Sequence, residues 1–311
     1  MFRAVAARGW LPAYVGVVVL WGSVFAFVKL ALVSFTPVGV SLGRMILASV
    51  TLLAICLATR TALPPRRLWG HLAVAALLAS VLSWTLMTWA QTHIPSALAA
   101  IIGSSVPLMT LLVVLVFFRE QRPTRERILG LIVGFAGIFI VVGIWHGLPA
   151  SQWIGIAAAA SGAFALAASI PYTRRYLTGG RAGTAVSPLS LASGMFILAT
   201  VETAPLGLAF PLVHSTVTAS AVLCLVALGC LSSGIAFVLN YRVIQLTDST
   251  TASTVMYLTP LVAVAISTLV LHEQLTWNEP VGGAVILLGA AVAQGLVRLP
   301  TRHASPSAPT P

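Results

Sequence analysis

Three ionisable side chains lie inside long apolar stretches of the sequence: Lys29, Arg44 and Glu202. A charge inside a lipid bilayer is costly, so such residues usually pair with one another or mark the path of a substrate or ion. Two interpretations follow. Either Glu202 pairs with Arg44 or Lys29, or the two cations attract a substrate carboxylate, as an amino acid or organic acid would supply. Lys29 lies about four residues from the end of its stretch, so its ammonium group could also reach the interface.

The sequence lacks the side-chain combinations that membrane enzymes use. Hydrolysis inside a membrane needs a nucleophile with its base, a pair of aspartates, or a metal cluster such as H-E-x-x-H. The only aspartate is Asp248, in a predicted loop, and no such cluster occurs. Cys56, Cys224 and Cys230 lie in apolar stretches and suggest neither a disulfide nor a metal site. We therefore predict that the protein is not an enzyme and holds no metal or cofactor.

A second kind of candidate is a helix face rich in aromatic and hydroxyl side chains. Trp84, Met87, Thr88 and Gln91 follow the i, i+3, i+4, i+7 spacing that places them on one side of a helix. Packing or interhelical hydrogen bonding explains any one of them alone, so only their joint position favours a site. The candidate substrate-binding residues are Trp21, Phe25, Lys29, Arg44, Trp84, Met87, Thr88, Ser104, Tyr172, Asn240, Tyr241 and Tyr257. Such a lining suits an apolar or amphipathic small molecule held by few polar contacts.

The composition places these residues in a lipid bilayer. Hydrophobic residues make up 59% of the 311 residues and charged residues only 7%, whereas a soluble globular chain carries about 25% charged residues. Apolar stretches of about 20 residues, the length of a membrane-crossing helix, recur along the chain. We predict an all-α integral membrane protein with ten transmembrane helices, at residues 11–33, 36–59, 69–91, 95–118, 126–144, 152–173, 184–207, 218–241, 249–271 and 280–298.

The distribution of positive charge predicts the orientation of these helices. The 17 Lys and Arg residues give a net charge of +11. All of them except Lys29 and Arg44 fall on one side if the N-terminus is cytoplasmic, as the positive-inside rule requires. We therefore predict a multi-pass protein of the cell (inner) membrane with both termini in the cytoplasm. The arginines are spread over successive loops rather than gathered on one basic surface, which argues against nucleic acid as a partner.

The chain contains the same pattern twice. The stretch "SSVPLMTLLVVLVFFREQ" (104–121) matches "YLTPLVAVAISTLVLHEQ" (257–274) at an offset of 153, and "PVGVSLGRMILASV" (37–50) matches "PLSLASGMFILATV" (188–201) at an offset of 151. Residues 11–144 and 152–298 therefore form two five-helix repeats, followed by a Pro-rich cytoplasmic tail (299–311) that we predict to be disordered. Because five is odd, the second repeat enters the membrane from the opposite side. Inverted repeats are typical of secondary transporters, which expose a central site to each side in turn.

Two prolines occupy equivalent positions in the repeats. Pro107 and Pro260 lie deep in the fourth and ninth apolar stretches. Proline in mid-helix removes a hydrogen bond and frees a carbonyl one turn earlier, here the carbonyls of Gly103 and Met256. A free carbonyl in a membrane belongs where protein or water supplies a partner. A structural kink explains either proline alone, whereas the matched pair favours two gating positions beside a central pathway.

These landmarks resemble the EamA branch of the drug/metabolite transporter superfamily. The resemblance rests on "LWGSVFAFVKLAL" in the first stretch, Arg44 in the second, and the proline-to-"EQ" ends of the fourth and ninth, and it covers about residues 12–298. It implies a ten-helix exporter of amino acids or other small metabolites, driven by ion or substrate gradients, and leaves proton coupling open. The small multidrug exporters resemble half of this plan but carry an essential glutamate in the first helix, which this chain lacks. We therefore predict export of an amino acid or related amphipathic compound, with multidrug or lipophilic-cation export as the alternative.

A small-residue motif bears on assembly. Gly130 and Gly134 in "GLIVG" have the spacing that lets two membrane helices approach closely. The motif could pack inside the bundle or join two copies of the chain. Internal packing fits a ten-helix bundle better, so we expect a monomer or a weak homodimer.

Overall fold

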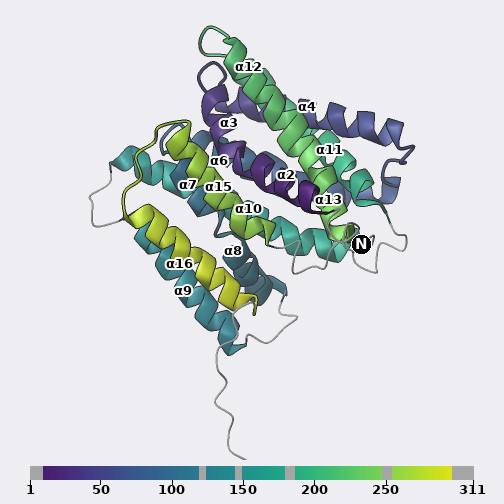
Figure 1. Ribbon diagram of the computed structural model, residues 1–311. Helices are drawn as coiled ribbons and strands as arrows, with labels where there is room; N and C mark the ends of the chain where they lie inside the picture. Colours follow the sequence, from purple (N-terminus) through teal and green to yellow (C-terminus); the bar gives the residue numbers. More distant parts are fainter. Residues whose placement is uncertain (1–9, 119–123, 144–148, 179–185, 247–253, 296–311) are drawn as a thin grey trace, which may run out of the picture.

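The protein is a bundle of membrane-spanning helices (Figure 1). The computed structural model describes residues 10–118, 124–143, 149–178, 186–246 and 254–295, without the side chains of Phe118 and Tyr241. The predicted tail, Glu120 and Asp248 lie outside the described residues. Within these described ranges, seven helical segments are long and apolar enough to cross a membrane, and α15 and α16 are shorter apolar helices. With α9 they make ten spans, as predicted.

Each repeat contributes five spans. In the first repeat they are α2 (Leu11–Gly22) with α3 (Val24–Ala31), then α4 (Pro37–Ala58), then η1 (Arg66–Leu68), α5 (Trp69–Ala76), η2 (Leu77–Leu82) and α6 (Ser83–Ala90), then α7 (Ser96–Gly103), α8 (Val106–Val113) and η3 (Val114–Phe118), and finally α9 (Arg125–Val142). In the second repeat they are α10 (Ala150–Thr173) with η5 (Arg174–Thr178), then α11 (Pro188–Ala209), then α12 (Ala219–Val226), η7 (Ala227–Ile235) and α13 (Ala236–Leu246), then α15 (Val255–Leu269) and α16 (Asn278–Ala293).

The second helix of each repeat begins in the same way. Thr36 precedes Pro37 at the start of α4, and its hydroxyl oxygen accepts the backbone N–H three residues later at 3.1 Å. Ser187 and Pro188 repeat this arrangement at the start of α11, also at 3.1 Å. A hydroxyl at the N-cap uses one of the free amides of the first turn, and proline fits the first helical position because its missing N–H would be unpaired there. The two copies therefore share their local start signals.

Equivalent helices of the two repeats run in opposite directions. Ser49 on α4 lies 3.0 Å from Thr200 on α11, and Cys56 lies 3.1 Å from Ser193. Residue numbers thus rise along α4 while they fall along α11, so the helices are antiparallel. Because α4 and α11 are the same helix of the repeat, the two repeats are inverted. Ser49 and Thr200 are themselves equivalent at the offset of 151, so this pair marks the pseudo-twofold axis.

Each repeat is completed by the other. The first span, α2, packs against α13 and α15 of the second repeat. Its counterpart α10 packs in the same way against α6 and α8 of the first repeat. The fifth spans, α9 and α16, lie side by side at one edge of the bundle (Figure 1). The repeats therefore fold as one body, and residues from both can meet at its centre.

Glycine brings α9 and α16 into close contact. A Cβ atom at Gly130 would lie 2.5 Å from the backbone nitrogen of Ala293, and one at Gly137 would lie 2.9 Å from the Gly282 carbonyl oxygen. A Cβ at Gly134 would collide with the side chain of Leu108. No larger residue fits these positions without separating the helices. The "GLIVG" motif therefore packs within the chain, as predicted.

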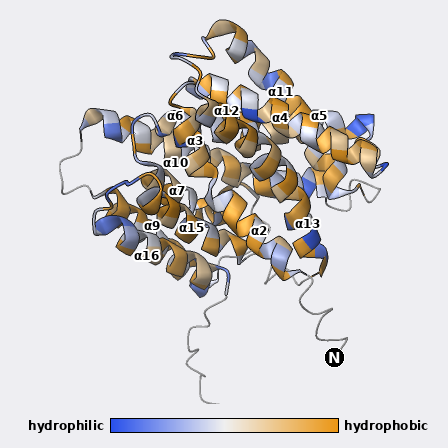
Figure 2. Cartoon of the chain, turned by 45° about the horizontal axis from the view of Figure 1, so that its top comes forward, coloured by the Kyte–Doolittle hydropathy of each residue, from blue (hydrophilic) through white to orange (hydrophobic). Residues whose placement is uncertain are grey.

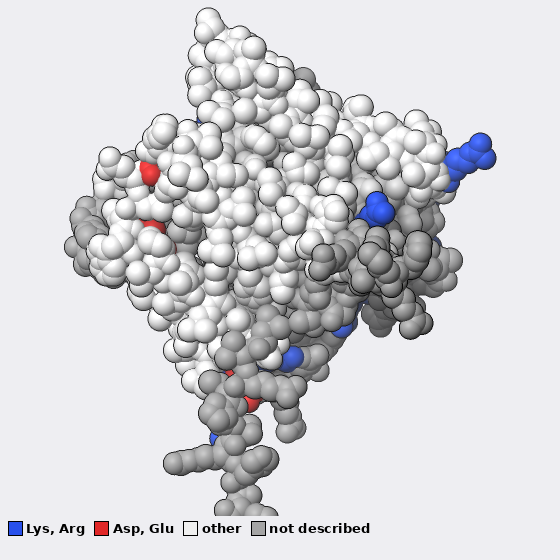
Figure 3. Space-filling view, in the orientation of Figure 1, with Lys and Arg blue, Asp and Glu red and all other residues white. Residues whose placement is uncertain are grey.

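The outer surface of the bundle is apolar. Leu57 is 80% exposed and Leu208 is 90% exposed, and hydrophobic colour predominates along the helices (Figure 2). One broad face shows no Lys, Arg, Asp or Glu over its middle (Figure 3). Such a surface is stable against lipid rather than water. The fold is therefore that of a multi-pass membrane protein.

Two π-helical segments occur at equivalent positions in the third span of each repeat. They are η2 in the first repeat and η7 in the second. A π-helical turn holds an extra residue, so it shifts the helix face that follows, and such turns often occur at functional sites. Ser80 in η2 and Ser233 in η7 match at the offset of 153. The periodicity of the sequence did not predict these segments.

The two prolines differ in their effect on the helix. The fourth span breaks at Ser104 and Ser105, so that Pro107 lies in the first turn of α8. The hydroxyl of Ser104 donates to the Ile101 carbonyl at 2.6 Å, which satisfies one carbonyl at the break. In the ninth span α15 continues through Pro260. The structure therefore shows a break at only one of the two predicted positions in the described residues, and a gating role for either proline stays a prediction.

Candidate functional site

Arg44 is a buried cation held between the two repeats. It projects from α4, and only 2% of its surface is exposed. Its Nε donates to the Ser233 hydroxyl on η7 at 2.7 Å, and its guanidinium carbon lies 3.7 Å from the centre of the Trp84 ring on α6. Nη1 has no hydrogen-bond partner. Arg44 therefore keeps an unused donor in a buried position.

Aromatic rings continue the site from Arg44 towards α2. The Trp21 and Phe237 rings meet edge to face with centres 5.8 Å apart, a geometry that aromatic pairs prefer. The indole Nε1 of Trp21 donates to the Ser232 carbonyl at 3.2 Å. Ser232 and Ser233 are neighbours on η7, so one π-helical segment contacts both Trp21 and Arg44. We call Trp21, Arg44, Trp84, Ser233 and Phe237 the central cluster.

The central cluster stands on a rigid apolar base. Trp84 and Phe237 both pack against a buried core that includes Met45 and Phe196. The rings of Phe196 and Phe237 are 5.6 Å apart and nearly perpendicular. Phe196 is 1% exposed and Met45 is fully buried. This packing holds the Trp84 ring, which lies against Arg44, and the Phe237 ring in place.

A second group of predicted residues surrounds the first half of the fourth span. A Cβ at Gly103 would lie 3.4 Å from Cζ of Phe25 and 3.5 Å from Cε of Met87, so both side chains reach this helix. Tyr257 packs against the same core cluster, and its hydroxyl is buried without a hydrogen-bond partner. The structure therefore brings Phe25, Met87 and Tyr257 together around one core cluster, next to the helix break.

The remaining predicted residues on the third, fourth and eighth spans are less informative. Thr88 is 2% exposed and Ser104 is 8% exposed, and the Ser104 hydroxyl is used by its own helix. Asn240 is half-buried on α13. Tyr241 lies on α13, but its side chain is outside the described part of the chain. A substrate role for these four residues stays a prediction.

The proposed pairing of Glu202 with Arg44 or Lys29 does not occur. The Lys29 ammonium donates instead to the Gln91 carbonyl at the end of α6, at 2.9 Å. Arg44 bonds to Ser233, and Oε2 of Glu202 is buried without a hydrogen-bond partner. Opposite charges on neighbouring helices meet only if the helices carry them to the same height and side. The interpretation that Arg44 attracts a substrate carboxylate remains.

Tyr172 lies apart from the central cluster. Its hydroxyl is 2.9 Å from Nδ1 of His71, and the His71 ring stacks on Tyr176 with centres 4.8 Å apart. Tyr172 packs against a different core cluster, which includes Leu68 and Leu177. These residues belong to the ends of the third and sixth spans that the charge pattern places at the cytoplasmic side. The structure therefore does not bring Tyr172 together with Trp21 and Arg44.

Sequence reasoning missed some residues of the site. Helical spacing does not single out Ser232 or Ser233, although Ser80 matches Ser233 at the repeat offset and is a signal for it. Phe196 stands out in the sequence only as part of a repeat, because nothing in a phenylalanine distinguishes a ring that supports a site from any other buried ring. Both omissions concern residues whose role depends on a neighbour from another helix.

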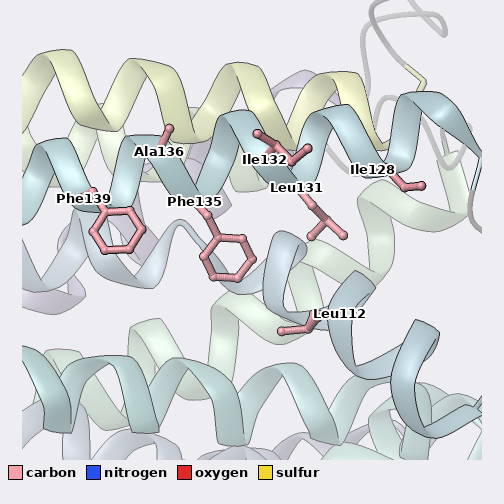
Figure 4. Close-up of a pocket in the computed structure, with 7 residues that line it drawn as sticks. All are labelled: Leu112, Ile128, Leu131, Ile132, Phe135, Ala136 and Phe139. Atoms are coloured by element: carbon pink, nitrogen blue, oxygen red, sulfur yellow. The ribbon is translucent and has the colours of Figure 1, made fainter.

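A groove on the outer surface is separate from the candidate site. It holds about 550 Å³ and is lined by Leu112 of the fourth span and one face of α9, with Ile128, Leu131, Ile132, Phe135, Ala136 and Phe139 (Figure 4). Figure 4 shows Phe135 and Phe139 pointing from α9 into the space beside Leu112. All seven side chains are aliphatic or aromatic, and none belongs to the predicted set. The groove suits the apolar lipid surroundings and carries no polar group that could select a ligand.

The fold and the central cluster together define a membrane transporter. Inverted five-helix repeats enclose a buried site to which both contribute, which is the arrangement of transporters that open to each side in turn. The EamA-like transporter family matches residues 9–143 and 152–294, once in each half. The chain belongs to the EamA-like transporter family.

Comparison with known proteins gives further relatives. The chain is 30% identical over 283 residues to a "Probable terminal-alkyne amino-acid exporter" of Streptantibioticus cattleyicolor, which covers 89% of this chain and 90% of the relative. It is 29% identical over 124 residues, 40% of each chain, to the "Uncharacterized inner membrane transporter YedA" of Escherichia coli. A crystal structure at 20% identity has the same fold, with a TM-score of 0.63 and coverage of 93% of this chain and 98% of that one.

Proposed function

We propose that the protein exports a small amphipathic metabolite, an amino acid or a related compound, across the cell (inner) membrane by alternating access. The observation that carries this proposal is the central cluster at the junction of the repeats. There a buried guanidinium lies against Trp84, and η7 links it to the paired rings of Trp21 and Phe237. Rings and one charged donor suit a ligand with an apolar part and one polar end. The amino-acid exporter of Streptantibioticus cattleyicolor, at 30% identity, supports the substrate class and the direction.

Export of lipophilic cations is the second candidate function. The aromatic rings favour it, because a cation over an indole or phenyl face is attracted by the ring. The Arg44 guanidinium disfavours it, because it already occupies the Trp84 face at 3.7 Å and repels a second positive charge. No carboxylate occurs among residues 11–33, where a cation exporter of the small multidrug type would carry one.

The orientation belongs to the same proposal. With both termini in the cytoplasm, Lys29 and Gln91 lie near the outer face, and His71 and Tyr172 lie near the inner face. The positive-inside distribution of the 17 Lys and Arg residues supports it. Reporter tags at the N-terminus and in the loop between α9 and α10 should report opposite compartments. Signals from the same compartment would contradict the orientation and the inverted topology together.

The function is tested by comparing cells that express the protein with cells that carry an empty vector. The probes are L-phenylalanine, L-propargylglycine (a terminal-alkyne amino acid) and the cationic dye ethidium. We expect faster release of at least one amino acid from preloaded cells and no change in ethidium efflux. Ethidium efflux without amino acid release would reject the amino-acid proposal in favour of the second candidate. A variant with Trp21→Ala and Phe237→Ala serves as the control, because it keeps Arg44 and Trp84 and removes the other two rings of the central cluster.

A further inference from the structure

We propose that Arg44, with Trp84 and Ser233, forms a carboxylate-binding site, and that the transported compound therefore carries a carboxylate next to an apolar or aromatic group. The part of the inference that names the transported compound rests on the proposed function. The binding site itself rests only on the geometry around Arg44. Nothing in the family match or in the names of the relatives assigns this site.

The charge of Arg44 is not balanced by the protein. The sequence holds six Asp and Glu residues. Glu202 is the only one inside an apolar span, and in the described part of the chain neither it nor another carboxylate pairs with Arg44. Neighbours of the guanidinium are neutral: the Ser233 hydroxyl at 2.7 Å and the Trp84 ring at 3.7 Å. A buried charge without a counter-ion is strongly unfavourable, so an anion that enters the site would supply what the protein lacks.

The fold does not need a charge at this position. Arg44 corresponds to Met195 in the second repeat, at the offset of 151. Met195 occupies the equivalent place on α11 and packs against the core clusters with its apolar side chain. The same helix, in the same architecture, is therefore stable with an apolar residue at this point. Arg44 therefore distinguishes the first repeat from the second, and a bound ligand would account for a charge that the fold itself does not require.

The geometry favours one class of anion. The guanidinium is a planar fork of donors that matches a carboxylate. Ser233 occupies Nε, while Nη1 is unpaired. One guanidinium balances the single charge of a carboxylate but only half that of a phosphate dianion. Lys29 does not add to the site, because its ammonium bonds to the Gln91 carbonyl. The Trp84 ring against the guanidinium, with Phe237 packed on the same apolar core, suits a monocarboxylate with an apolar body.

The site is tested by the binding of phenylacetate and phenylacetamide to the purified full-length protein. The two probes have the same shape, and only the first carries a carboxylate. Tryptophan fluorescence reports binding, because Trp84 stacks on Arg44. We expect phenylacetate to bind at least about tenfold more tightly than phenylacetamide to the wild type, since a buried charge pair contributes more than that.

Three variants separate a ligand role from a structural one. Arg44→Met installs the residue that the second repeat uses, and it should abolish the preference for phenylacetate without lowering Tm, because an apolar residue replaces an unbalanced charge. Arg44→Lys keeps the charge but loses the planar fork, so the preference should fall severalfold. Ser41→Ala is the matched control: it removes another buried, unpaired polar atom from the same helix and should change nothing.

The outcomes distinguish failure of the site from failure of the function. Equal binding of the two probes by the wild type, or an unchanged preference in Arg44→Met, overturns the inference. If Arg44→Met does not fold, an unchanged preference in Arg44→Lys overturns it. In proteoliposomes, L-phenylalanine should move faster than L-phenylalaninamide. If neither moves and the cells export ethidium, the proposed function fails, while the phenylacetate comparison still decides the carboxylate site.

Discussion

Glu273 offers the sharpest test of how the repeats hold each other. Its carboxylate lies at the start of α7, where Oε1 accepts the Ser96 amide at 3.0 Å and Oε2 accepts the Ser96 hydroxyl at 2.8 Å and the Ala97 amide at 3.1 Å. The Ser96 hydroxyl also lies 2.9 Å from Ser267 on α15. A residue of the second repeat thus caps a helix of the first. Glu273→Ala removes all three contacts at once.

The size of the effect follows from the exposure of Glu273. Three charge-assisted hydrogen bonds would contribute about 4.5–9 kcal/mol if each added its full value. Glu273 is only half-buried, so water replaces part of what the substitution removes. The loss in stability is therefore better estimated from two smaller terms. Losing a helix cap costs about 0.5–2 kcal/mol, and losing a favourable charge at a helix N-terminus costs about 0.3–1 kcal/mol. We expect about 2 kcal/mol for Glu273→Ala, which is about a 30-fold change in the opening equilibrium.

The effect should be confined to the first turn of α7. Hydrogen exchange measured by mass spectrometry on the detergent-solubilised protein should show the amides of residues 96–100 exchanging about 30-fold faster, because exchange follows the local opening equilibrium. Peptides from α4 and α11 should keep their wild-type rates, which shows that the fold is intact. The matched control is Glu126→Ala, which removes a first-turn carboxylate of α9 and leaves α7 untouched.

One result would refute this reasoning. If Glu273→Ala exchanges at residues 96–100 within twofold of the wild-type rate, the carboxylate does not hold the helix start. An equal acceleration at α4 and α11 would mean that the substitution loosens the whole bundle and that the cap is not a local contact.

Three further predictions concern packing and the limits of the site. Gly289→Leu should lower the Tm sharply or prevent folding, because its Cβ collides with the Gly134 backbone. The control Gly70→Ala should leave the Tm unchanged, because nothing lies within 4 Å of the added carbon, and a stable Gly289→Leu protein would contradict the contact. Trp21→Phe should cost about 1 kcal/mol by losing the hydrogen bond to Ser232. Trp21→Ala should cost more, but less than the roughly 3–5 kcal/mol of a fully buried tryptophan, because Trp21 is only partly buried; thermal unfolding measures both, and equal losses would show that ring packing contributes little. Tyr172→Phe removes the contact with His71 but should leave the KM of amino acid transport within twofold of wild type, whereas Trp84→Ala should raise it at least tenfold; a large effect of Tyr172→Phe would place that residue in the pathway.

The bundle could be predicted because its signals are carried by many residues at once. Apolar stretches, the two matched blocks and the distribution of arginine each involve long segments, so errors at single positions cancel. The packing of Gly130 on Ala293 could also be anticipated, since small residues at a fixed spacing have few uses in a membrane helix. Only the exact helix ends differ, as in α16, which ends at Ala293 rather than at residue 298 within the described chain.

The site was harder to predict because it depends on where helices meet. Helical spacing correctly grouped Trp84 with Met87 on one span, yet these two side chains face different core clusters in the bundle. The π-helical segments η2 and η7 shift the faces that follow them, and no residue pattern announces such a shift. The predicted pairing of Glu202 with a cation is wrong for the same reason. The sequence shows the opposite charges, but it does not show the relative height and rotation of α4 and α11.

The inverted repeat suggests where to look for chemistry in this protein. Positions where the two halves agree support the frame: Ser49 with Thr200 marks the axis, and Thr36 and Ser187 begin equivalent helices. A substrate is not symmetric, so the groups that recognise it must break the symmetry. Arg44 against Met195 is one such break in charge between α4 and α11, and Glu202 against Thr51 is another. A transporter that opens to each side in turn needs a symmetric frame to move and an asymmetric residue to bind its substrate, and we propose that the buried Arg44 is such a residue.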